Sequence, residues 1–340
     1  MNINELLYLK HTLRFDENGK FRILLMSDLH AGKNFNPQLT DAIEATVAHT
    51  KPNLVLINGD TSGCRDDVHC ETCEELRDLL KEITRPMESR KIPWAHTFGN
   101  HDDNYGLPID VQQKVYEEFE YCISKSGDED ISGTGNYVLP VLSNSSDKIR
   151  FNVWGFDSHS NIPKFAKQIG LPENTRIKMR TPTYIGNDYD SIHPDQIHWY
   201  YSVSKALEKY NGEKIPAIAF MHIAIPEFMV IVRNREHCGY KGNQREDLGC
   251  GDINFGFFGA CLERGDVKGI FAGHDHVNDF TGRYMGIMLG YDGGLTYDGY
   301  QDDDIRGARL FEIDENDAAN FETRMIYTRD IMGEKGDRRI

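Results

Sequence analysis

The sequence lacks any long hydrophobic run. Nowhere do about 18 apolar residues follow one another, which is the length that a membrane-spanning helix needs. The first residues, MNINELLYLKHTLRF, contain only the short apolar run LLYL, which does not resemble the core of a secretory signal peptide. We therefore expect no membrane partner and a cytoplasmic location.

Positive charge is also scarce. Lys and Arg number 38 against 54 Asp and Glu, which gives a net charge of −16 at pH 7. Such a chain repels polyanions at long range, so nucleic acid is not expected as a main partner. A small phosphorylated molecule can still bind in a local pocket that is basic or rich in metal.

Cysteines are few and unevenly spaced. Their number is seven, and an odd count scattered over a long chain suits a reducing compartment better than a disulfide framework. Cys64, His69, Cys70 and Cys73 lie close together in the sequence, but no second C-x-x-C accompanies them. Free thiols in a loop are therefore favoured over a zinc or redox site.

Internal repeats, low-complexity tracts and linker-like runs are absent, and apolar segments alternate with amphipathic ones. The predicted strands are Phe21–Ser27, Asn53–Asn58, Ile92–Phe98, Phe151–Phe156, Lys214–Ile223 and Val267–Gly273. The predicted helices follow an N-cap at Asn36, span Thr72–Ser89, run through Val111, Val115, Phe119 and Ile123, and span Pro194–Tyr210. This alternation predicts an α/β fold, and we expect a single domain over residues 1–340, with a core at about 20–300 and a closing β-hairpin at about 306–328.

Two segments, Ser158–His193 and Pro226–Phe258, are too long for plain connections and are predicted to be lids or binding loops. The second contains a basic group that could hold an anionic part of a substrate or form a solvated loop face: Arg233, Arg235, Lys241 and Arg245. The stretch Tyr291–Tyr300 could line a pocket with aromatic rings, or its glycines could serve only as turns.

Polar clusters stand at the ends of five predicted strands. In chain order they are Asp28-Leu29-His30, Gly59-Asp60, Gly99-Asn100-His101-Asp102, His222 and His274-Asp275-His276. Each cluster alone has an ordinary explanation as a turn, a helix cap or a hydrogen-bonded core histidine. Because the carboxyl ends of strands in open α/β sheets form the crevice where ligands bind, we expect the five clusters to converge.

The residue types at these strand ends indicate metal binding. Carboxylate, imidazole and amide oxygen without thiolate suit Mn²⁺, Fe, Zn²⁺ or Mg²⁺. The candidate ligands are Asp28, His30, Asp60, Asn100, His222, His274 and His276. Seven ligands are too many for one tetrahedral ion, whereas two ions about 3.5–4 Å apart, bridged by one carboxylate, would use them all. If the backbone is extended, each D-x-H or H-x-H pair faces one side, and Leu29 and Asp275 point away.

The five blocks resemble those of the calcineurin-like metallophosphoesterase superfamily. The family pattern is D-x-H, G-D, G-N-H-[D/E], a lone His after an apolar strand, and G-H-x-H, and this sequence has DLH, GD, GNHD, MH and GHDH in the same order. The resemblance covers about residues 20–300 and implies a four-layer sandwich of two mixed β-sheets flanked by α-helices. It also implies residue roles: Asp28, His30 and His276 on one metal, Asn100, His222 and His274 on the other, Asp60 bridging, and His101 assisting the leaving group.

Further segments are similar to the subgroup related to purple acid phosphatases, namely HIAIPEF, GYKGN and GHDHVNDF. Purple enzymes carry a tyrosine shortly after the G-D aspartate and no histidine in the first block. Here GDTSG has no tyrosine, and DLH supplies His30. We therefore expect a site that is not purple and that holds two divalent ions, with Mn²⁺, Fe²⁺/Fe³⁺ or Zn²⁺ as candidates.

The function expected from this pattern is that of a dinuclear metal-dependent phosphohydrolase, a phosphomonoesterase in preference to a phosphodiesterase. In-line attack at phosphorus by a metal-bridging hydroxide would be assisted by His101, which would protonate or polarise the leaving oxygen. Two alternatives are a non-catalytic scaffold, which would be expected to lose ligands, and a nuclease, which the net charge of −16 disfavours.

Overall fold

The computed structural model describes residues 7–63, 70–104, 106–161, 189–251, 253–333 and 338–339. Cys64, His69 and most of the segment Ser158–His193 lie outside the described residues. None of the described helices has the length and apolar character needed to cross a bilayer.

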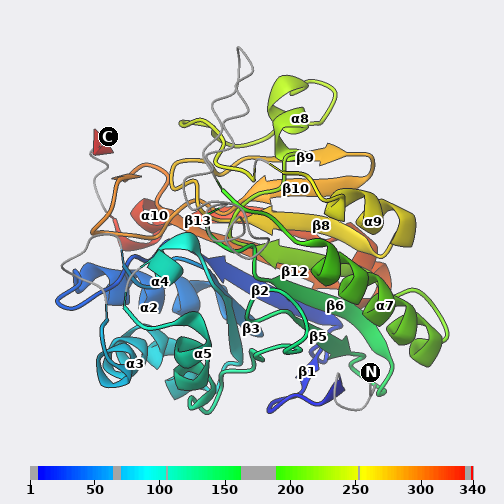
Figure 1. Cartoon of the computed structure of the whole chain (residues 1–340), viewed down its shortest axis with the longest axis horizontal. Coiled ribbons are helices and arrows are strands. Elements are labelled where there is room, and N and C mark those ends of the chain that lie inside the picture. The colour runs from blue at the N-terminus through cyan, green and yellow to red at the C-terminus, as the bar shows by residue number, and fades with distance from the viewer. Residues whose placement is uncertain are drawn as a thin grey trace.

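Two large β-sheets form the centre of the molecule (Figure 1). The seven-stranded sheet contains, in spatial order, β1 (Leu13–Arg14), β5 (Tyr137–Leu142), β6 (Ile149–Phe156), β7 (Ala217–Met221), β8 (Val267–Ala272), β10 (Ile287–Tyr291) and β9 (Thr281–Tyr284). The five-stranded sheet contains β13 (Glu322–Tyr327), β12 (Gly307–Asp314), β2 (Lys20–Met26), β3 (Leu54–Asn58) and β4 (Trp94–Thr97). A two-stranded sheet pairs β11 (Gln301–Asp302) with β14 (Arg338–Arg339).

Both large sheets are mixed. In the five-stranded sheet β2, β3 and β4 are parallel, while β12 runs antiparallel to both β2 and β13. In the seven-stranded sheet β6, β7, β8 and β10 are parallel neighbours, while β5 and β9 are antiparallel additions. The predicted closing hairpin is confirmed as β12 and β13, which are joined by the 3-10 helix η1 (Glu315–Asn320).

Helices cover the outer faces of the sheets, as Figure 1 shows. The helices are α2 (Gln38–Thr50), α3 (Cys73–Arg90), α4 (Asn100–Asn104), α5 (Ile109–Glu117), α7 (Pro194–Asn211), α8 (Phe228–Arg233), α9 (Phe257–Arg264) and α10 (Thr328–Met332). Buried side chains of α2 and α3 pack on the five-stranded sheet, and those of α7 and α9 pack on the seven-stranded sheet. The four-layer α/β sandwich predicted from the sequence is therefore confirmed.

The alternation of β2 explains how one strand serves two cores. Leu24 and Met26 face the helix-covered core, while Ile23 and Leu25 face a third core that lies between the two sheets. A strand that is apolar on both faces must be buried on both, and all four side chains are 0% exposed. The continuous apolar run thus places β2 at the centre of the sandwich.

Local sequence signals set most helix boundaries. Thr72 and Glu75 form a capping box at the start of α3. The N-cap of α2 is Pro37 and not the predicted Asn36, although the Asn36 side chain accepts a hydrogen bond from the Gln38 backbone. The predicted helix through Phe119 and Ile123 was too long, because α5 ends at Glu117. The chain after α5 instead pairs with the edge of β4, where the Ile123 N–H donates to the Trp94 carbonyl at 2.8 Å.

Candidate metal centre

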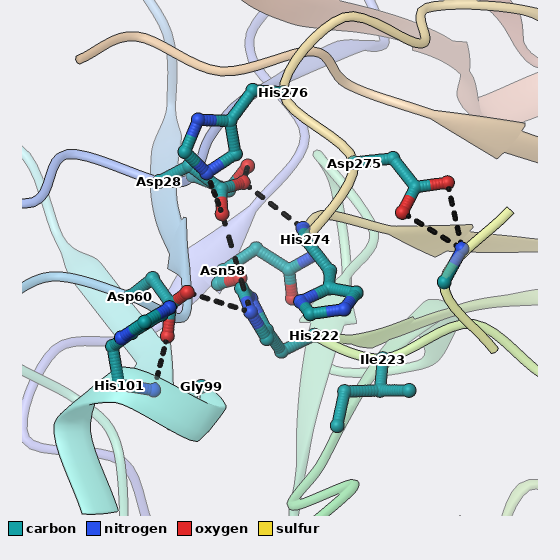
Figure 2. A network of polar contacts seen from close by, with 12 residues as sticks. Asp28, Asn58, Asp60, Gly99, His101, His222, Ile223, His274, Asp275 and His276 are labelled. Atoms are coloured by element: carbon teal, nitrogen blue, oxygen red, sulfur yellow. Dashed lines mark hydrogen bonds and ion pairs between the residues drawn. The ribbon is translucent and has the colours of Figure 1, made fainter. Parts of the chain in front are cut away.

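The structure gathers the polar residues that follow β2, β3, β4, β7 and β8 into one buried cluster (Figure 2). Within each sheet these strands are parallel neighbours, so they end on the same side. Two groups of three side chains have ligand atoms within 4.8 Å of one another: Asp28, His30 and His276, and Asp60, His222 and His274. The six side chains come from the predicted ligand set, and their binding of metal stays a prediction.

The backbone at these strand ends is not extended as the sequence analysis assumed. Asp28, His30, Asp60 and His274 have φ values of 52°, 46°, 48° and 74°. This left-handed region is unfavourable for residues with a Cβ, and such strain is often found at functional sites. Backbone hydrogen bonds hold the conformation, including one from the His30 N–H to the Asp60 carbonyl at 2.9 Å.

Two glycines allow the loops to approach the cluster. Gly59 has a φ of +87°, and a Cβ there would lie 2.4 Å from the His222 ring. At Gly99 a Cβ would lie 2.2 Å from Oδ1 of Asp60. The glycines of the G-D and G-N-H blocks are therefore needed because His222 and Asp60 occupy the space that a side chain would take.

Backbone carbonyls orient three of the histidines. Nδ1 of His30 lies 2.8 Å from the Gly63 carbonyl, Nδ1 of His222 lies 2.9 Å from the Asn58 carbonyl, and Nδ1 of His276 lies 2.7 Å from the Tyr300 carbonyl. A carbonyl only accepts, so each Nδ1 must donate, which leaves Nε2 of the neutral ring with its lone pair. Nε2 of His30 and Nε2 of His276 are 2.9 Å apart, and two lone pairs at this distance repel each other. A proton or a metal ion between the two nitrogens would remove the repulsion.

The two aspartates each divide their oxygens between the protein and the centre of the cluster. Oδ2 of Asp28 accepts from the His274 backbone N–H at 3.0 Å, and Oδ1 lies 3.3 Å from Nε2 of His276. Oδ1 of Asp60 accepts from the His101 backbone N–H at 2.8 Å. Its Oδ2 lies 3.2 Å from Nε2 of His222 and 3.7 Å from Nε2 of His30, so Asp60 reaches both groups of ligands.

Several buried polar atoms at the centre have no hydrogen-bond partner among the described residues. They are Oδ1 of Asp28, Oδ2 of Asp60 and Oδ1 of Asn100, together with Nε2 of His222, which lies 3.2 Å from Oδ2 of Asp60 and forms an ion pair with it when His222 is protonated. A buried polar atom without a partner destabilises a fold by about 1–3 kcal/mol, so this concentration of lone pairs needs a compensating ligand. Oxygen and imidazole lone pairs directed at one centre fit divalent cations, and Asn100 supplies the amide oxygen expected from the sequence.

The charges of the buried histidines differ in the metal-free protein. Burial lowers the pKa of His30 to about 4 and that of His274 to about 3, so both imidazoles are neutral at pH 7. Burial acts in the same direction on His222, but the charge of Asp60 outweighs it and raises the pKa of His222 to about 10. A proton on His222 therefore occupies a place that a metal ion would take.

Mn²⁺ binding is expected to tighten as the pH rises from about 6 to about 8. His222 is protonated throughout this window because its folded-state pKa is raised to about 10, and a bound ion must displace that proton. Although burial opposes it, the charge of Asp28 raises the pKa of His276 as well, so at least one proton is released and the dissociation constant falls about tenfold or more for each pH unit. Calorimetry in buffers of different ionisation enthalpy measures the release directly. His49→Gln, at an exposed position of α2, should keep the same slope, and an affinity that does not change with pH would contradict the assignment.

His101 lies beside the cluster but outside both groups of ligands. Its ring contacts that of His30 edge-on, with the centroids 5.1 Å apart, and its Nδ1 finds no hydrogen-bond partner among the residues that the structure describes. Asp102 does not orient this ring: its carboxylate accepts from the Gly99 and Ser62 backbone N–H groups, both at 2.9 Å. Asp102 thus ties together the loops after β3 and β4, which carry Asp60 and Asn100.

A cavity of about 530 Å³ opens onto the cluster. Its lining includes the predicted residues His30, Asp60, His101, His274 and His276. The other lining residues, which were not named as site residues from the sequence, are Tyr189, Glu246, Asp247, Gly249, Asp275, Asp298, Gly299 and Tyr300. The stretch Tyr291–Tyr300 was expected as a possible aromatic lining, and of its three tyrosines Tyr300 lines the cavity.

Asp275 and two members of the predicted basic group, Arg235 and Arg245, have structural partners outside the cluster. Figure 2 shows Asp275 turned away from His274, and its carboxylate accepts from the Gly249 backbone N–H at 3.0 Å. Arg235 lies over the ring of Tyr240 at 4.5 Å, and Arg245 pairs with Asp302. None of the four basic residues lines the cavity among the described residues, so an anion-holding role for them has no support here.

Comparison with known proteins identifies the family. The model of the calcineurin-like phosphoesterase family matches residues 21–278. The chain belongs to this family. The match spans the five blocks from DLH to GHDH, and the phosphoesterase resemblance predicted from them is confirmed.

Individual relatives agree with the predicted subgroup. "Probable inactive purple acid phosphatase 14" of Arabidopsis thaliana is 30% identical over 326 residues, which cover 86% of this chain and 74% of the relative. "Phosphatase DCR2" of Saccharomyces cerevisiae is 28% identical, and the match covers 90% of this chain and 53% of that protein. The residues after Asp60 in the described loop, Thr61, Ser62 and Gly63, include no tyrosine, and the Gly63 carbonyl instead holds His30.

Two solved structures share the fold. A dimetal phosphatase from Danio rerio has 13% sequence identity and a TM-score of 0.51, with 91% of this chain and 99% of that chain covered. A Plasmodium protein described as "GAP50 the anchor in the inner membrane complex" has 10% identity and a TM-score of 0.52, with coverage of 94% and 88%. At this level of identity the two structures establish the architecture alone.

Proposed function

We propose that this phosphoesterase is a dinuclear metal-dependent phosphomonoesterase that acts on a small phosphate ester. The observation that carries the proposal is the convergence of the predicted ligands around buried lone pairs that lack hydrogen-bond partners, beneath a cavity of about 530 Å³. A cavity of this size is typical of small-molecule sites. The relatives named as phosphatases favour a phosphate ester as substrate.

The residues that would hold the ions form two sets. Asp28, His30 and His276 would hold one ion, Asn100, His222 and His274 the other, and Asp60 would contribute to both. Two bound divalent ions would supply the positive charge that activates a water molecule and neutralises the phosphoryl oxygens. The carbonyls of Gly63, Asn58 and Tyr300 fix the rings of His30, His222 and His276 in the tautomer that leaves Nε2 available.

His101 is the residue proposed to assist the leaving group. In the reaction a water oxygen forms a bond to phosphorus, the ester P–O bond breaks, and the departing alkoxide needs a proton to leave as an alcohol. His101 lines the cavity, and the hydrogen bond from its backbone to Asp60 fixes its position at the start of α4. An imidazole is suited to donate that proton near neutral pH.

A non-catalytic role is the second candidate, because curated relatives include a plant protein named "probable inactive" and the fold is shared with a protein described as an anchor. A scaffold has no need to retain metal ligands. This chain keeps the full predicted set together with His101, which favours catalysis.

Metal analysis combined with paired assays tests the proposal. With added Mn²⁺ the protein is expected to hydrolyse p-nitrophenyl phosphate faster than bis-p-nitrophenyl phosphate, and a chelator should abolish both rates. Faster hydrolysis of the diester would show that the protein is a phosphodiesterase and not a phosphomonoesterase. The proposed enzymatic function would be contradicted if the protein bound no metal and hydrolysed neither compound in the presence of Mn²⁺.

A further inference from the structure

The cavity walls above the metal ligands are acidic. Besides Asp60, its described lining contains the carboxylates of Glu246, Asp247 and Asp298. Asp275 also lines the cavity, but its buried carboxylate accepts from the Gly249 backbone and the Asn278 side chain instead. No lysine or arginine is among the described residues that line it. The positive charge expected in the site is that of the two metal ions at the floor of the cavity. There the buried Oδ2 of Asp60 has no hydrogen-bond partner among the described residues. Whatever extends from the phosphoryl group towards the walls therefore meets negative charge.

Glu246 is held at a fixed position in this wall. Its Oε1 accepts from the Val277 backbone N–H at 2.9 Å, and its Oε2 accepts from the Tyr300 hydroxyl at 3.1 Å. The Tyr300 ring stacks on His276 with 4.1 Å between centroids and 2° between planes. One aromatic ring, that of Tyr300, thus lies between Glu246 and the predicted metal ligand His276.

The neighbouring cation in the described chain, Arg245, does not neutralise this wall. Arg245, the residue before Glu246, pairs with Asp302 instead. Oδ2 of Asp298 accepts a hydrogen bond from the Asn36 backbone N–H at 2.8 Å, which fixes the side chain without cancelling its charge. Burial raises the pKa of Glu246, and the hydrogen bonds from Val277 and Tyr300 together with the nearby His276 oppose that rise.

Aromatic rings complete the wall. Tyr189 lies edge-on to His274 with 4.3 Å between centroids, and Tyr300 remains 51% exposed after stacking on His276. Carboxylates and tyrosine rings both attract ammonium groups, the first by charge and the second through the ring face. The same carboxylates and ring faces repel an anionic group on the alcohol part of an ester. The wall therefore selects against such esters as well as in favour of esters that carry an ammonium group.

Building on the phosphomonoesterase function, we propose that the substrates are phosphate esters of amino alcohols, whose ammonium group binds at the wall formed by Glu246, Tyr300 and Asp298. The phosphoryl group lies at the metal ligands, and the positive charge lies on the alcohol that leaves. Nucleotides and sugar bisphosphates carry further phosphates on that side and are rejected.

Three two-carbon esters test the proposal, because they differ only in the terminal group. The Mn²⁺-loaded protein should have the highest kcat/KM for phosphoethanolamine, a lower value for ethylene glycol phosphate, and the lowest for phosphoglycolate. A partly exposed charge pair supports a ratio of about two- to fivefold between the first two. Equal rates, or a preference for phosphoglycolate, would overturn the amino alcohol assignment while hydrolysis of p-nitrophenyl phosphate still upheld the phosphatase. Absence of all hydrolysis would overturn both.

Glu246→Gln isolates the charge, because the amide oxygen can still accept from the Val277 N–H. The ratio of kcat/KM for phosphoethanolamine to that for ethylene glycol phosphate should fall towards one, and phosphoglycolate should gain relative to both. Glu263→Gln is the matched control: Glu263 also accepts from a tyrosine hydroxyl, that of Tyr201 at 2.9 Å, but lies exposed on α9 away from the cavity lining. An unchanged ratio in Glu246→Gln would contradict the proposal.

Discussion

Asp60→Asn is expected to remove tightly bound metal and to lower kcat/KM by at least about a thousandfold, because both sets of ligands depend on this carboxylate. Its Oδ2 lies 3.2 Å from His222 and 3.7 Å from His30, one histidine of each group. Its Oδ1 already accepts from the His101 backbone N–H. An amide has only one oxygen, so it cannot serve both places: either its NH₂ group faces the ions, or it opposes the His101 N–H.

Metal content and turnover should fall together in this variant. Elemental analysis after gel filtration and rates on p-nitrophenyl phosphate measure the two effects. The matched control is Asp78→Asn on α3, where an exposed aspartate pairs with Lys81 at 2.8 Å, and it should keep metal and activity. Retention of two ions by Asp60→Asn would show that the bridging assignment is wrong, whatever the rate.

The sequence predicted the strands and the α/β class because periodicity and apolar runs depend on burial, which is a local property of the chain, whereas the four layers were implied by the resemblance to the family. β2 is an example, since alternate residues such as Ile23 and Leu24 enter different cores. The end of α5 was not predictable in the same way. Phe119 continues the helical spacing, but the pairing of the next segment with Trp94 at the edge of β4 ends the helix. Tertiary hydrogen bonding there outweighs local periodicity.

The predicted ligands were recognisable because each follows an apolar strand, and parallel strands bring such positions together. Their backbone conformation was not, since nothing in DLH or GHDH signals a positive φ at Asp28 or His274. The acidic wall was also missed. Glu246 and Asp298 lie in irregular segments after different strands, and neither residue type nor spacing distinguishes them from the many other acidic residues of the chain.

His101→Ala is expected to spare metal binding and to lower kcat by about 10²- to 10⁴-fold on alkyl phosphates, the usual contribution of a positioned general acid. The variant keeps what the metal centre needs from this residue, since the hydrogen bond to Asp60 comes from the backbone and alanine favours the helix that begins there. The loss should be much smaller for p-nitrophenyl phosphate, whose leaving group departs readily without a proton.

This dependence on the leaving group separates proton donation from a structural role. A residue that only packs on His30, which His101 contacts at 5.1 Å between ring centroids, would affect all esters alike. Rates for a series of esters with leaving groups of increasing basicity therefore decide between the two roles, with metal content measured in parallel. His49→Ala on the exposed face of α2 controls for loss of a histidine elsewhere. A uniform loss across the series would assign His101 to packing, and full activity would exclude it from the reaction. Among the described residues, every other imidazole that lines the cavity belongs to one of the two groups of predicted ligands, so none of them could replace His101 as the proton donor.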